Sequence, residues 1–319
     1  MHFGTTAQGQ DVEKITLQAG DLTVAILTWG AVVQDVRLAG IDRSLTLGSD
    51  RIADYEGAMR YHGSLIGPIV NRISTARVKV DGIMYELERN QDGRIHLHSG
   101  AEATHLRVWD VAERSDSHVR LTCTLPDGAC GLPGHREVSV TYTVTAPADL
   151  RVEIDATTDA KTPLSFANHS YWNLDGSAQW NGHRLQVLAD RFLPATSDDY
   201  PTGEIVEVSG TDMDFRTPRV ITAKQDWLDN NFCLSDTRQP LRHALTLTGA
   251  SGVTLQLDTT EPGVQVYDGR AAKRPDRAPF EGLAIEAQMW PDAPTNRAFP
   301  SIMCDPDTPY RQETRFRFS

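Results

Sequence analysis

Residues 138–144 read Val-Ser-Val-Thr-Tyr-Thr-Val and residues 150–154 read Leu-Arg-Val-Glu-Ile, so apolar and polar side chains alternate through both stretches. Successive side chains of a strand point to opposite faces, so this alternation predicts strands with one buried and one solvated face. The same alternation runs through 119–125 and 253–257, whereas helical periodicity is almost absent, its best candidate being the short segment 222–228. The pattern predicts an all-β chain that folds as a large antiparallel β-sandwich.

A hairpin turn is predicted at Asp81-Gly82. The alternating residues Val78 and Val80 precede this dipeptide, and a second alternating run begins at Ile83. Asp-Gly between two such runs is a strong hairpin signal, because both turn positions require a positive φ. The 24 glycines and 17 prolines are spread between the predicted strands and are not gathered into a linker. We therefore expect residues 1–319 to form a single domain.

The 319-residue chain is strongly acidic, with a formal net charge of −12 at pH 7. Nucleic acids and anionic membranes attract proteins with a surplus of Lys and Arg, so neither is an expected partner. No apolar run approaches the roughly 18–20 residues of a membrane span, and the N-terminal residues lack the pattern of a secretory signal. The four scattered cysteines are expected to be free thiols in a reducing compartment: Cys123, Cys130, Cys233 and Cys304. We therefore expect a cytoplasmic protein, as a monomer or a homodimer.

Motifs for several common chemistries are missing, and one metal-like motif is present. The sequence has neither a GxGxxG turn nor a GxxxxGK[ST] loop, so a nucleotide cofactor is not expected. His96 and His98 form HxHxxxE with Glu102, which resembles the first metal motif of the cupins. The glycine that cupins place before the first histidine is Asn90 here, and no second cupin motif follows. A cupin-like metal enzyme is an alternative, but the leading expectation includes no metal and no cofactor.

Residues 166–174 combine aromatic rings with amide, hydroxyl and imidazole groups, and read Phe-Ala-Asn-His-Ser-Tyr-Trp-Asn-Leu. An ordinary core strand is not this polar, because each unpaired buried polar group costs about 1–3 kcal/mol. Aromatic rings beside hydrogen-bonding groups suit a sugar, whose ring has an apolar face and a polar rim. A structural histidine at a strand end is the other interpretation of His169.

A third cluster places a carboxylate on a predicted strand. Leu283, Ile285 and Ala287 alternate, which puts Glu286 and Gln288 together on the opposite face. The pattern alone favours a solvated carboxylate at Glu286. Burial in a pocket would instead raise its pKa and make it a usable base near neutrality.

Seven motifs in order extend these clusters over nearly the whole chain. They are Gly67-Pro68-Ile69-Val70-Asn71-Arg72-Ile73, Leu97-His98-Ser99-Gly100, Asn168-His169-Ser170-Tyr171-Trp172-Asn173-Leu174, Asp214-Phe215-Arg216, Leu228-Asp229-Asn230-Asn231-Phe232, Pro262-Gly263-Val264-Gln265-Val266-Tyr267, and Glu286-Ala287-Gln288 followed by Pro291-Asp292. In this order they resemble the motifs of the aldose 1-epimerase, or galactose mutarotase, family.

The resemblance implies a galactose mutarotase-like supersandwich, which agrees with the strand pattern. It also implies an isomerase that interconverts the α and β anomers of aldohexoses such as glucose and galactose, with a sugar as its small-molecule substrate and no cofactor. Opening the sugar ring requires a base for the C1 hydroxyl and an acid for the ring oxygen. A carboxylate with a raised pKa and an imidazole near neutrality can hold opposite protonation states at one pH.

By resemblance, Glu286 is the general base and His169 the general acid. His98 would hydrogen-bond the ring oxygen or a neighbouring hydroxyl. The remaining expected substrate-binding residues are Arg72 and Asp229, which would fix sugar hydroxyls, and Gln265 and Tyr267, which would line the pocket.

Two departures from the family pattern bear on the choice of substrate. Where the family usually has GRxANR, this chain reads GPIVNR, and only Arg72 remains of the two arginines. Where YTGN is common, the chain has Tyr267-Asp268-Gly269-Arg270 and continues as a basic stretch from Arg270 to Arg277. That stretch is either a solvated surface loop or a loop over the pocket that favours a phosphorylated or acidic sugar. A non-catalytic sugar-binding module on the same fold is the remaining alternative.

Overall fold

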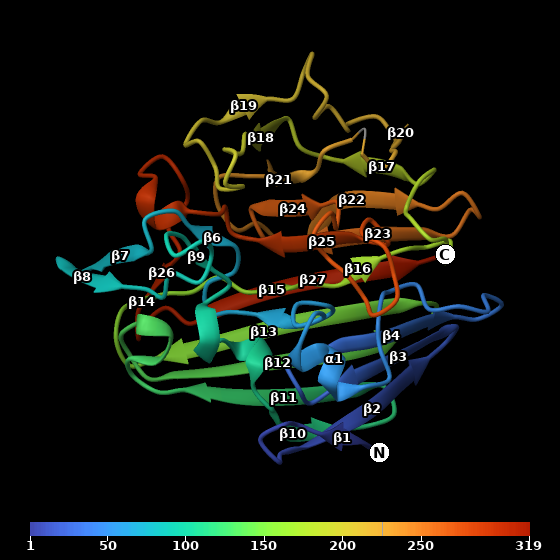
Figure 1. Cartoon of the computed structure of the whole chain (residues 1–319), viewed down its shortest axis with the longest axis horizontal. Coiled ribbons are helices and arrows are strands. Elements are labelled where there is room, and N and C mark those ends of the chain that lie inside the picture. The colour runs from blue at the N-terminus through green and yellow to red at the C-terminus, as the bar shows by residue number, and fades with distance from the viewer. Residues whose placement is uncertain (225) are drawn as a thin grey trace.

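The computed structural model describes residues 1–224 and 226–319, and most of these residues belong to antiparallel sheets or to the loops that join them (Figure 1). Every pairing between the named strands of this described part is antiparallel, so the predicted all-β antiparallel fold is confirmed. In the same residues, no helix is long and apolar enough to cross a membrane.

The largest sheet has nine strands and contains the stretch that decided the fold. Its order is β10 (Asp110–Arg114), β11 (His118–Leu125), β12 (Arg136–Thr145), β13 (Asp149–Thr158), β27 (Tyr310–Phe318), β23 (Thr254–Thr259), β22 (Arg242–Thr248), β17 (Arg184–Val187) and β20 (Arg219–Val220). The C-terminal strand β27 lies between β13 and β23, and so joins the two halves of the chain in one sheet.

Two smaller sheets pack on this nine-stranded sheet. The six-stranded sheet has the order β16 (Tyr171–Trp172), β25 (Leu283–Gln288), β24 (Gly263–Tyr267), β21 (Asp229–Cys233), β18 (Arg191–Leu193) and β19 (Val206–Glu207). The four-stranded sheet is formed by β1 (His2–Thr5), β2 (Asp11–Ala19), β3 (Leu22–Leu27) and β4 (Val33–Leu38). A single hydrophobic core cluster contains side chains from all three sheets, which makes the fold a β-sandwich.

Short strand pairs and turns complete the chain. The pairs are β5 (Leu65–Ile66) with β15 (Ala167–Asn168), β6 (Arg72–Ile73) with β9 (His96–Leu97), β7 (Arg77–Val80) with β8 (Ile83–Glu86), and β14 (Thr162–Pro163) with β26 (Met303–Cys304). The described residues contain one short α-helix, α1 (Ile52–Glu56), and the 3₁₀ turns Gly100–Glu102, Thr104–Leu106, Ala129–Gly131 and Ala293–Thr295.

The helix considered over residues 222–228 is not found in 222–224 or 226–228, and Gln225 lies outside the described residues. The Asp226 carboxylate accepts a hydrogen bond from the backbone N–H of Thr222 at 2.7 Å and another from the Arg219 side chain at 2.7 Å. Such side-chain bonds to the backbone compete with helix formation. The sequence pattern gave no sign of α1.

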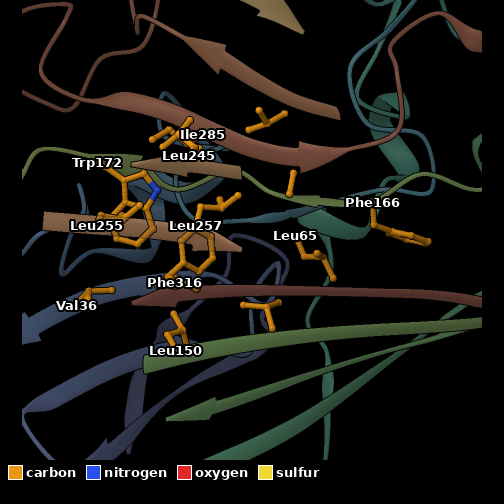
Figure 2. Packing of buried hydrophobic residues seen from close by; sticks show 14 of the residues in the cluster. Val36, Leu65, Leu150, Phe166, Trp172, Leu245, Leu255, Leu257, Ile285 and Phe316 are labelled. Carbon is orange, nitrogen blue, oxygen red and sulfur yellow. The ribbon is translucent and has the colours of Figure 1, made fainter. Parts of the chain in front are cut away.

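The core follows the predicted alternation. Val138, Val140, Tyr142 and Val144 of β12 are all buried, while the residues between them are mostly less buried. Figure 2 shows Phe316 of β27 beside Trp172, and their ring centroids lie 5.2 Å apart. Leu245, Leu255 and Leu257 of the nine-stranded sheet gather in the same region as Ile285 of β25 (Figure 2). Burial of this apolar surface is the main stabilising contribution to the sandwich.

The predicted hairpin is present as β7–β8. Asp81 and Gly82 have φ values of 46° and 88°, the positive values that the two-residue turn requires. Val78 and Val80 point into a second hydrophobic cluster, whereas Ile83 across the turn is 60% exposed. The four cysteines are all buried and unpaired, as expected.

Candidate active site

One face of the six-stranded sheet carries the expected site residues. Glu286 of β25 lies opposite Gln265 of β24, and Tyr267 of β24 lies opposite Asp229 of β21. Residues opposite each other, or two apart along a strand, share a face, so these four side chains lie on one face. The intervening residues, such as Ile285, point into the hydrophobic core on the other face. Strand register alone therefore gathers four of the seven expected residues.

Glu286 and His169 form a buried pair. Glu286 Oε1 lies 3.4 Å from Nε2 of His169, and only 2% and 4% of the two side chains are exposed. His169 follows β15. Its backbone N–H donates to the Ser64 carbonyl at 2.9 Å, and its carbonyl accepts from the Gly63 N–H at 3.0 Å. This pairing fixes the backbone of His169, and therefore the position of its ring opposite β25. The alternation alone favoured a solvated carboxylate at Glu286. This prediction is wrong, because other segments of the chain cover the polar face of β25.

Burial changes the proton affinity of both members of the pair. It raises the pKa of Glu286 well above its usual value, and the nearby Asp229 carboxylate raises it further while Arg72 opposes the shift. Burial also lowers the pKa of His169 to about 4, rather than leaving it near neutrality as expected. Glu286 Oε2 and His169 Nδ1 have no hydrogen-bond partner among the described residues, so neither atom has a hydrogen bond that would stabilise the charged form of its group. Burial therefore favours the neutral carboxyl group of Glu286 and the neutral imidazole of His169 over their charged forms.

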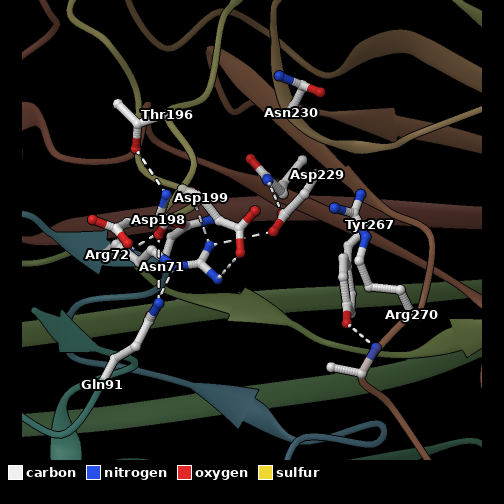
Figure 3. Close-up of polar contacts among 12 residues, drawn as sticks. Asn71, Arg72, Gln91, Thr196, Asp198, Asp199, Asp229, Asn230, Tyr267 and Arg270 are labelled. Carbon is white, nitrogen blue, oxygen red and sulfur yellow. Dashed lines mark hydrogen bonds and ion pairs between the residues drawn. The ribbon is translucent and has the colours of Figure 1, made fainter.

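Arg72 and Asp229 form a second polar group, which is shown in Figure 3. Arg72 Nη1 lies 3.4 Å from Asp229 Oδ2 and also donates to the Asp199 carbonyl at 3.0 Å, while Nε donates to Gln91 at 2.9 Å. Gln265 Nε2 donates to Asp229 Oδ1 at 2.7 Å. With both oxygens engaged, the Asp229 carboxylate is held in one orientation.

His98 is held in a defined tautomer by the backbone of Asn71. The Asn71 N–H donates to His98 Nδ1 at 3.1 Å, and the His98 N–H donates to the Asn71 carbonyl at 3.0 Å. Burial lowers the pKa of His98 well below its usual value, so the ring is neutral. Because Nδ1 accepts, the ring proton is on Nε2, and His98 offers a hydrogen-bond donor.

These residues line a cavity of about 570 Å³. Ala58, Arg60 and Ala271 are exposed members of the lining and mark its mouth, while His98, His169 and Glu286 are buried members at its base. The full lining is Gly57, Ala58, Arg60, Tyr61, His62, Asn71, Arg72, Leu97, His98, His169, Tyr171, Asp229, Tyr267, Ala271, Ala272 and Glu286. Six of the seven expected site residues are among them. Gln265, expected in the lining, lies behind Asp229 and supports it.

Sequence reasoning missed several aromatic residues of this cavity. The Tyr61 ring stacks on His169 with 5.9 Å between centroids and contacts His98 at 4.7 Å. The His62 ring stacks on Tyr171 at 4.4 Å. The only sequence signal for the first two was the neighbouring pair Tyr61-His62 itself, and Tyr171 was visible only as part of the polar cluster 166–174.

The metal-like motif does not assemble as a site. His96 Nδ1 contacts the Glu88 carbonyl at 2.8 Å, His98 Nδ1 is bonded to Asn71, and Glu102 accepts from the Cys130 N–H at 2.9 Å. His98 has a φ of 51°, so the chain leaves the extended conformation that would place both histidines on one face. Across residues 1–224 and 226–319, no group of three potential metal ligands is found.

Two carboxylates, Asp268 and Glu281, pair with the three arginines of the basic stretch from Arg270 to Arg277. Arg270 Nη2 lies 2.9 Å from Asp268, and Arg274 forms an ion pair with Glu281. Arg274 and Arg277 line a separate cavity of about 310 Å³, not the one that contains Glu286. Ala271 and Ala272 of the same stretch do line the Glu286 cavity, so the loop borders the pocket while Arg274 and Arg277 face the other cavity. The alternative that the stretch favours a phosphorylated or acidic sugar stays a prediction.

The fold and the site define a class: a large β-sandwich protein with a buried carboxyl–imidazole pair at the base of a polar and aromatic cavity. A family model described as Aldose 1-epimerase matches residues 13–317. The chain is 34% identical to a galactose mutarotase from Homo sapiens, covering 98% of this chain and 95% of that protein. It is 30% identical to an aldose 1-epimerase from Escherichia coli (strain K12), covering 97% and 96%.

A solved structure agrees with these relatives. An aldose epimerase homologue from C. elegans superimposes with a TM-score of 0.89 at 28% identity, over 97% of this chain and 99% of that one. The chain belongs to the aldose 1-epimerase family, and the expected isomerase class is confirmed.

Proposed function

We propose that this protein interconverts the α and β anomers of aldohexoses of the glucose and galactose type, with Glu286 as general base and His169 as general acid. Glu286 removes the proton of the C1 hydroxyl while His169 protonates the ring oxygen, and the C1–O bond of the ring breaks. The open aldehyde turns about its C1–C2 bond, and the ring closes on the other face of C1 as both protons return. Each proton transfer by a positioned group contributes typically 10²–10⁴-fold.

The observation that carries this proposal is the contact between Glu286 and His169 at 3.4 Å, buried at the base of one cavity. The reaction needs a proton acceptor and a proton donor within reach of two oxygens that are both bonded to C1. Two groups this close, facing one cavity, can serve both oxygens of one bound sugar.

The proton count of the pair also supports this chemistry. A neutral carboxyl and a neutral imidazole hold the same single proton as the carboxylate and imidazolium that the reaction uses. Only one proton transfer within the pair separates the resting form from the reactive form. The Arg72 guanidinium favours the ionised form of Glu286, and a sugar in the cavity would add hydrogen-bond partners for both groups.

The remaining residues bind and orient the sugar in this proposal. His98 donates from Nε2 to the ring oxygen or a neighbouring hydroxyl, and Arg72 with Asp229 holds hydroxyls away from C1. Gln265 acts through Asp229 and is a positioning residue, while Tyr267 forms part of the wall. Because these residues span positions 72 to 286 and share one cavity, we propose that residues 1–319 work as one domain.

Polarimetry on freshly dissolved α-glucose and α-galactose tests this proposal. We expect the protein to speed the approach of the optical rotation to equilibrium well beyond the spontaneous rate at the same pH. A rate equal to the spontaneous rate, together with binding of either sugar by calorimetry, would instead identify a non-catalytic sugar-binding protein.

A further inference from the structure

A second cavity, of about 310 Å³, lies apart from the Glu286 cavity and shares no lining residue with it. Small-molecule sites have volumes of roughly 300–1,000 Å³, so this cavity is large enough for a small ligand. Its charged lining residues are four arginines and three carboxylates: Arg37, Arg43, Arg274, Arg277, Asp35, Asp50 and Glu281. The second cavity therefore carries a net charge of +1, in a chain whose net charge is −12.

Two of the four arginines have an incompletely balanced charge. Arg43 donates to the neutral Leu174 carbonyl from Nε at 3.0 Å and from Nη2 at 2.7 Å, and it forms no ion pair with a carboxylate of the described residues. Arg274 and Arg277 share one carboxylate, that of Glu281. Arg274 Nε donates to Glu281 Oε2 at 2.9 Å, whereas Arg277 Nε lies 3.8 Å from Oε1. The excess positive charge therefore lies at Arg43 and Arg277.

Main-chain carbonyls hold this side of the second cavity in place. The two bonds to Leu174 fix the Arg43 guanidinium, and Arg274 Nη1 donates to the Gly48 carbonyl at 2.8 Å. Arg43 Nη1 and both Nη atoms of Arg277 make no hydrogen bond within the described part of the chain. These N–H groups are free to bind an acceptor, and the planar guanidinium fork suits the oxygens of a phosphate group.

The second cavity also offers a hydrogen-bond acceptor. Gln34 is 5% exposed and lines the cavity, and its Nε2 donates to the Ser49 carbonyl at 3.0 Å and to Asp50 Oδ1 at 3.2 Å. Its Oε1 has no partner among the residues that the structure describes. A buried carbonyl oxygen without a partner costs free energy, and a ligand hydroxyl would remove that cost. The lining therefore suits a ligand that carries both a negative charge and hydroxyl groups.

We propose that the second cavity binds a hydroxylated phosphate monoester, such as a hexose phosphate, with its phosphate at Arg43 and Arg277 and a hydroxyl at Gln34. A neutral sugar would leave the excess charge unbalanced, and inorganic phosphate would leave Gln34 Oε1 unpaired. The phosphate lies outside the Glu286 cavity, so this ligand is not an anionic substrate of that cavity. The site goes beyond the proposed function, because it requires no chemistry at C1.

Calorimetry with glucose 1-phosphate tests this site, because the phosphate on C1 prevents opening of the sugar ring. We expect it to bind the wild type more tightly than inorganic phosphate does, since only glucose 1-phosphate offers hydroxyls to Gln34. Arg277→Gln should weaken the binding of glucose 1-phosphate about three- to tenfold, and Arg43→Gln about tenfold, as loss of a charge-assisted hydrogen bond predicts. Added NaCl should lower the affinity, because it screens the arginines.

A matched control separates the two cavities. Arg60→Gln removes the same charge at the mouth of the Glu286 cavity and should leave the affinity for glucose 1-phosphate unchanged. Arg43 also holds the Leu174 carbonyl, so the folding of its variant is checked by thermal melting. The Arg277 side chain is 59% exposed, so Arg277→Gln should fold as the wild type does.

Three results would overturn the second site: no binding of glucose 1-phosphate to the wild type, an unchanged affinity in Arg277→Gln, or an equal loss of affinity in Arg60→Gln. Equal affinities for inorganic phosphate and glucose 1-phosphate would contradict the contact at Gln34. Failure of the wild type to accelerate glucose mutarotation would overturn the proposed function alone, because binding at the second cavity is measured directly.

Discussion

Strands β13 and β25 have the same alternating sequence pattern, but their polar residues lie in different environments. In β13, Leu150, Val152 and Ile154 are buried while Asp155 is exposed. In β25 every residue is buried, including Glu286 and Gln288. The polar face of β13 meets water, whereas the segments around Tyr61, His98 and His169 cover the polar face of β25.

This difference teaches that alternation assigns side chains to a face but does not say what covers that face. A polar side chain facing water costs little, whereas a covered one costs about 1–3 kcal/mol when unpaired. Both polar side-chain atoms of Gln288 and Oε2 of Glu286 have no partner among the described residues. We infer that the covered face of β25 is retained for its chemistry and not for its stability.

The largest effect is expected from Glu286→Gln, compared with Glu153→Gln on the open face of β13. Glutamine has nearly the same shape as glutamate but cannot accept the C1 proton, so we expect the catalysed mutarotation of glucose to fall about 10⁴-fold. Glu153 is partly exposed and ion-paired with Arg151, so its variant should keep full activity. Full activity of Glu286→Gln in polarimetry would contradict the assignment of the base.

A somewhat smaller loss is expected from His169→Asn. The asparagine cannot donate a full proton to the ring oxygen, so the polarimetric rate should fall about 10²- to 10³-fold. The loss is smaller than for Glu286 because the Nε2–H of His98 still offers a hydrogen bond near the same oxygen. His135, an exposed histidine next to β12, is the matched control, and His135→Asn should behave as wild type. Equal activity of the two asparagine variants would remove His169 from the mechanism.

The pH dependence of kcat/KM distinguishes a buried pair from a solvated one. Activity requires a single proton on the pair. The enzyme should therefore lose activity when the pair binds a second proton at low pH, and when it loses its only proton at high pH. Because the pKa of His169 is lowered to about 4, the rate should fall about tenfold per pH unit below this value. The raised pKa of Glu286 places the alkaline limit far above the usual range of a carboxyl group. A rate that already falls between pH 6 and 7 would contradict the burial of His169.

The smallest effect concerns stability and the buried histidines around Tyr61. Burial lowers the pKa of His105 to about 3, so below pH 6.5 the unfolded chain binds a proton that the folded chain does not. Stability should therefore fall as the pH is lowered, by about 1 kcal/mol between pH 6.5 and pH 5.5 for this residue. His105→Phe should remove that part of the pH dependence in urea unfolding, and His135→Gln should not. The same pH dependence in His105→Phe and wild type would show that His105 does not titrate in this way.

Local signals in the sequence predicted more of the fold than of the site. The Asp81-Gly82 hairpin and the strands β12 and β13 follow from nearest-neighbour chemistry and from alternation, and the structure confirms them. The positions of Glu286 and His169 were expected from motif resemblance, and the structure brings them together. Contacts between distant segments determine three further features. These are the lowered pKa of His169, the hydrogen bond from Gln265 to Asp229, and the position of Arg274 at another cavity. No local pattern carries that information.

The sequence by itself determined that this protein is an antiparallel β-sandwich of the aldose 1-epimerase family, because strand alternation and ordered motifs are properties of the linear chain. Only the tertiary structure decided that Glu286 is buried and that it lies 3.4 Å from His169 at the base of one cavity. Burial depends on what other segments place over a face, and a pKa depends on that burial. Both are therefore decided only when residues far apart in the chain come into contact.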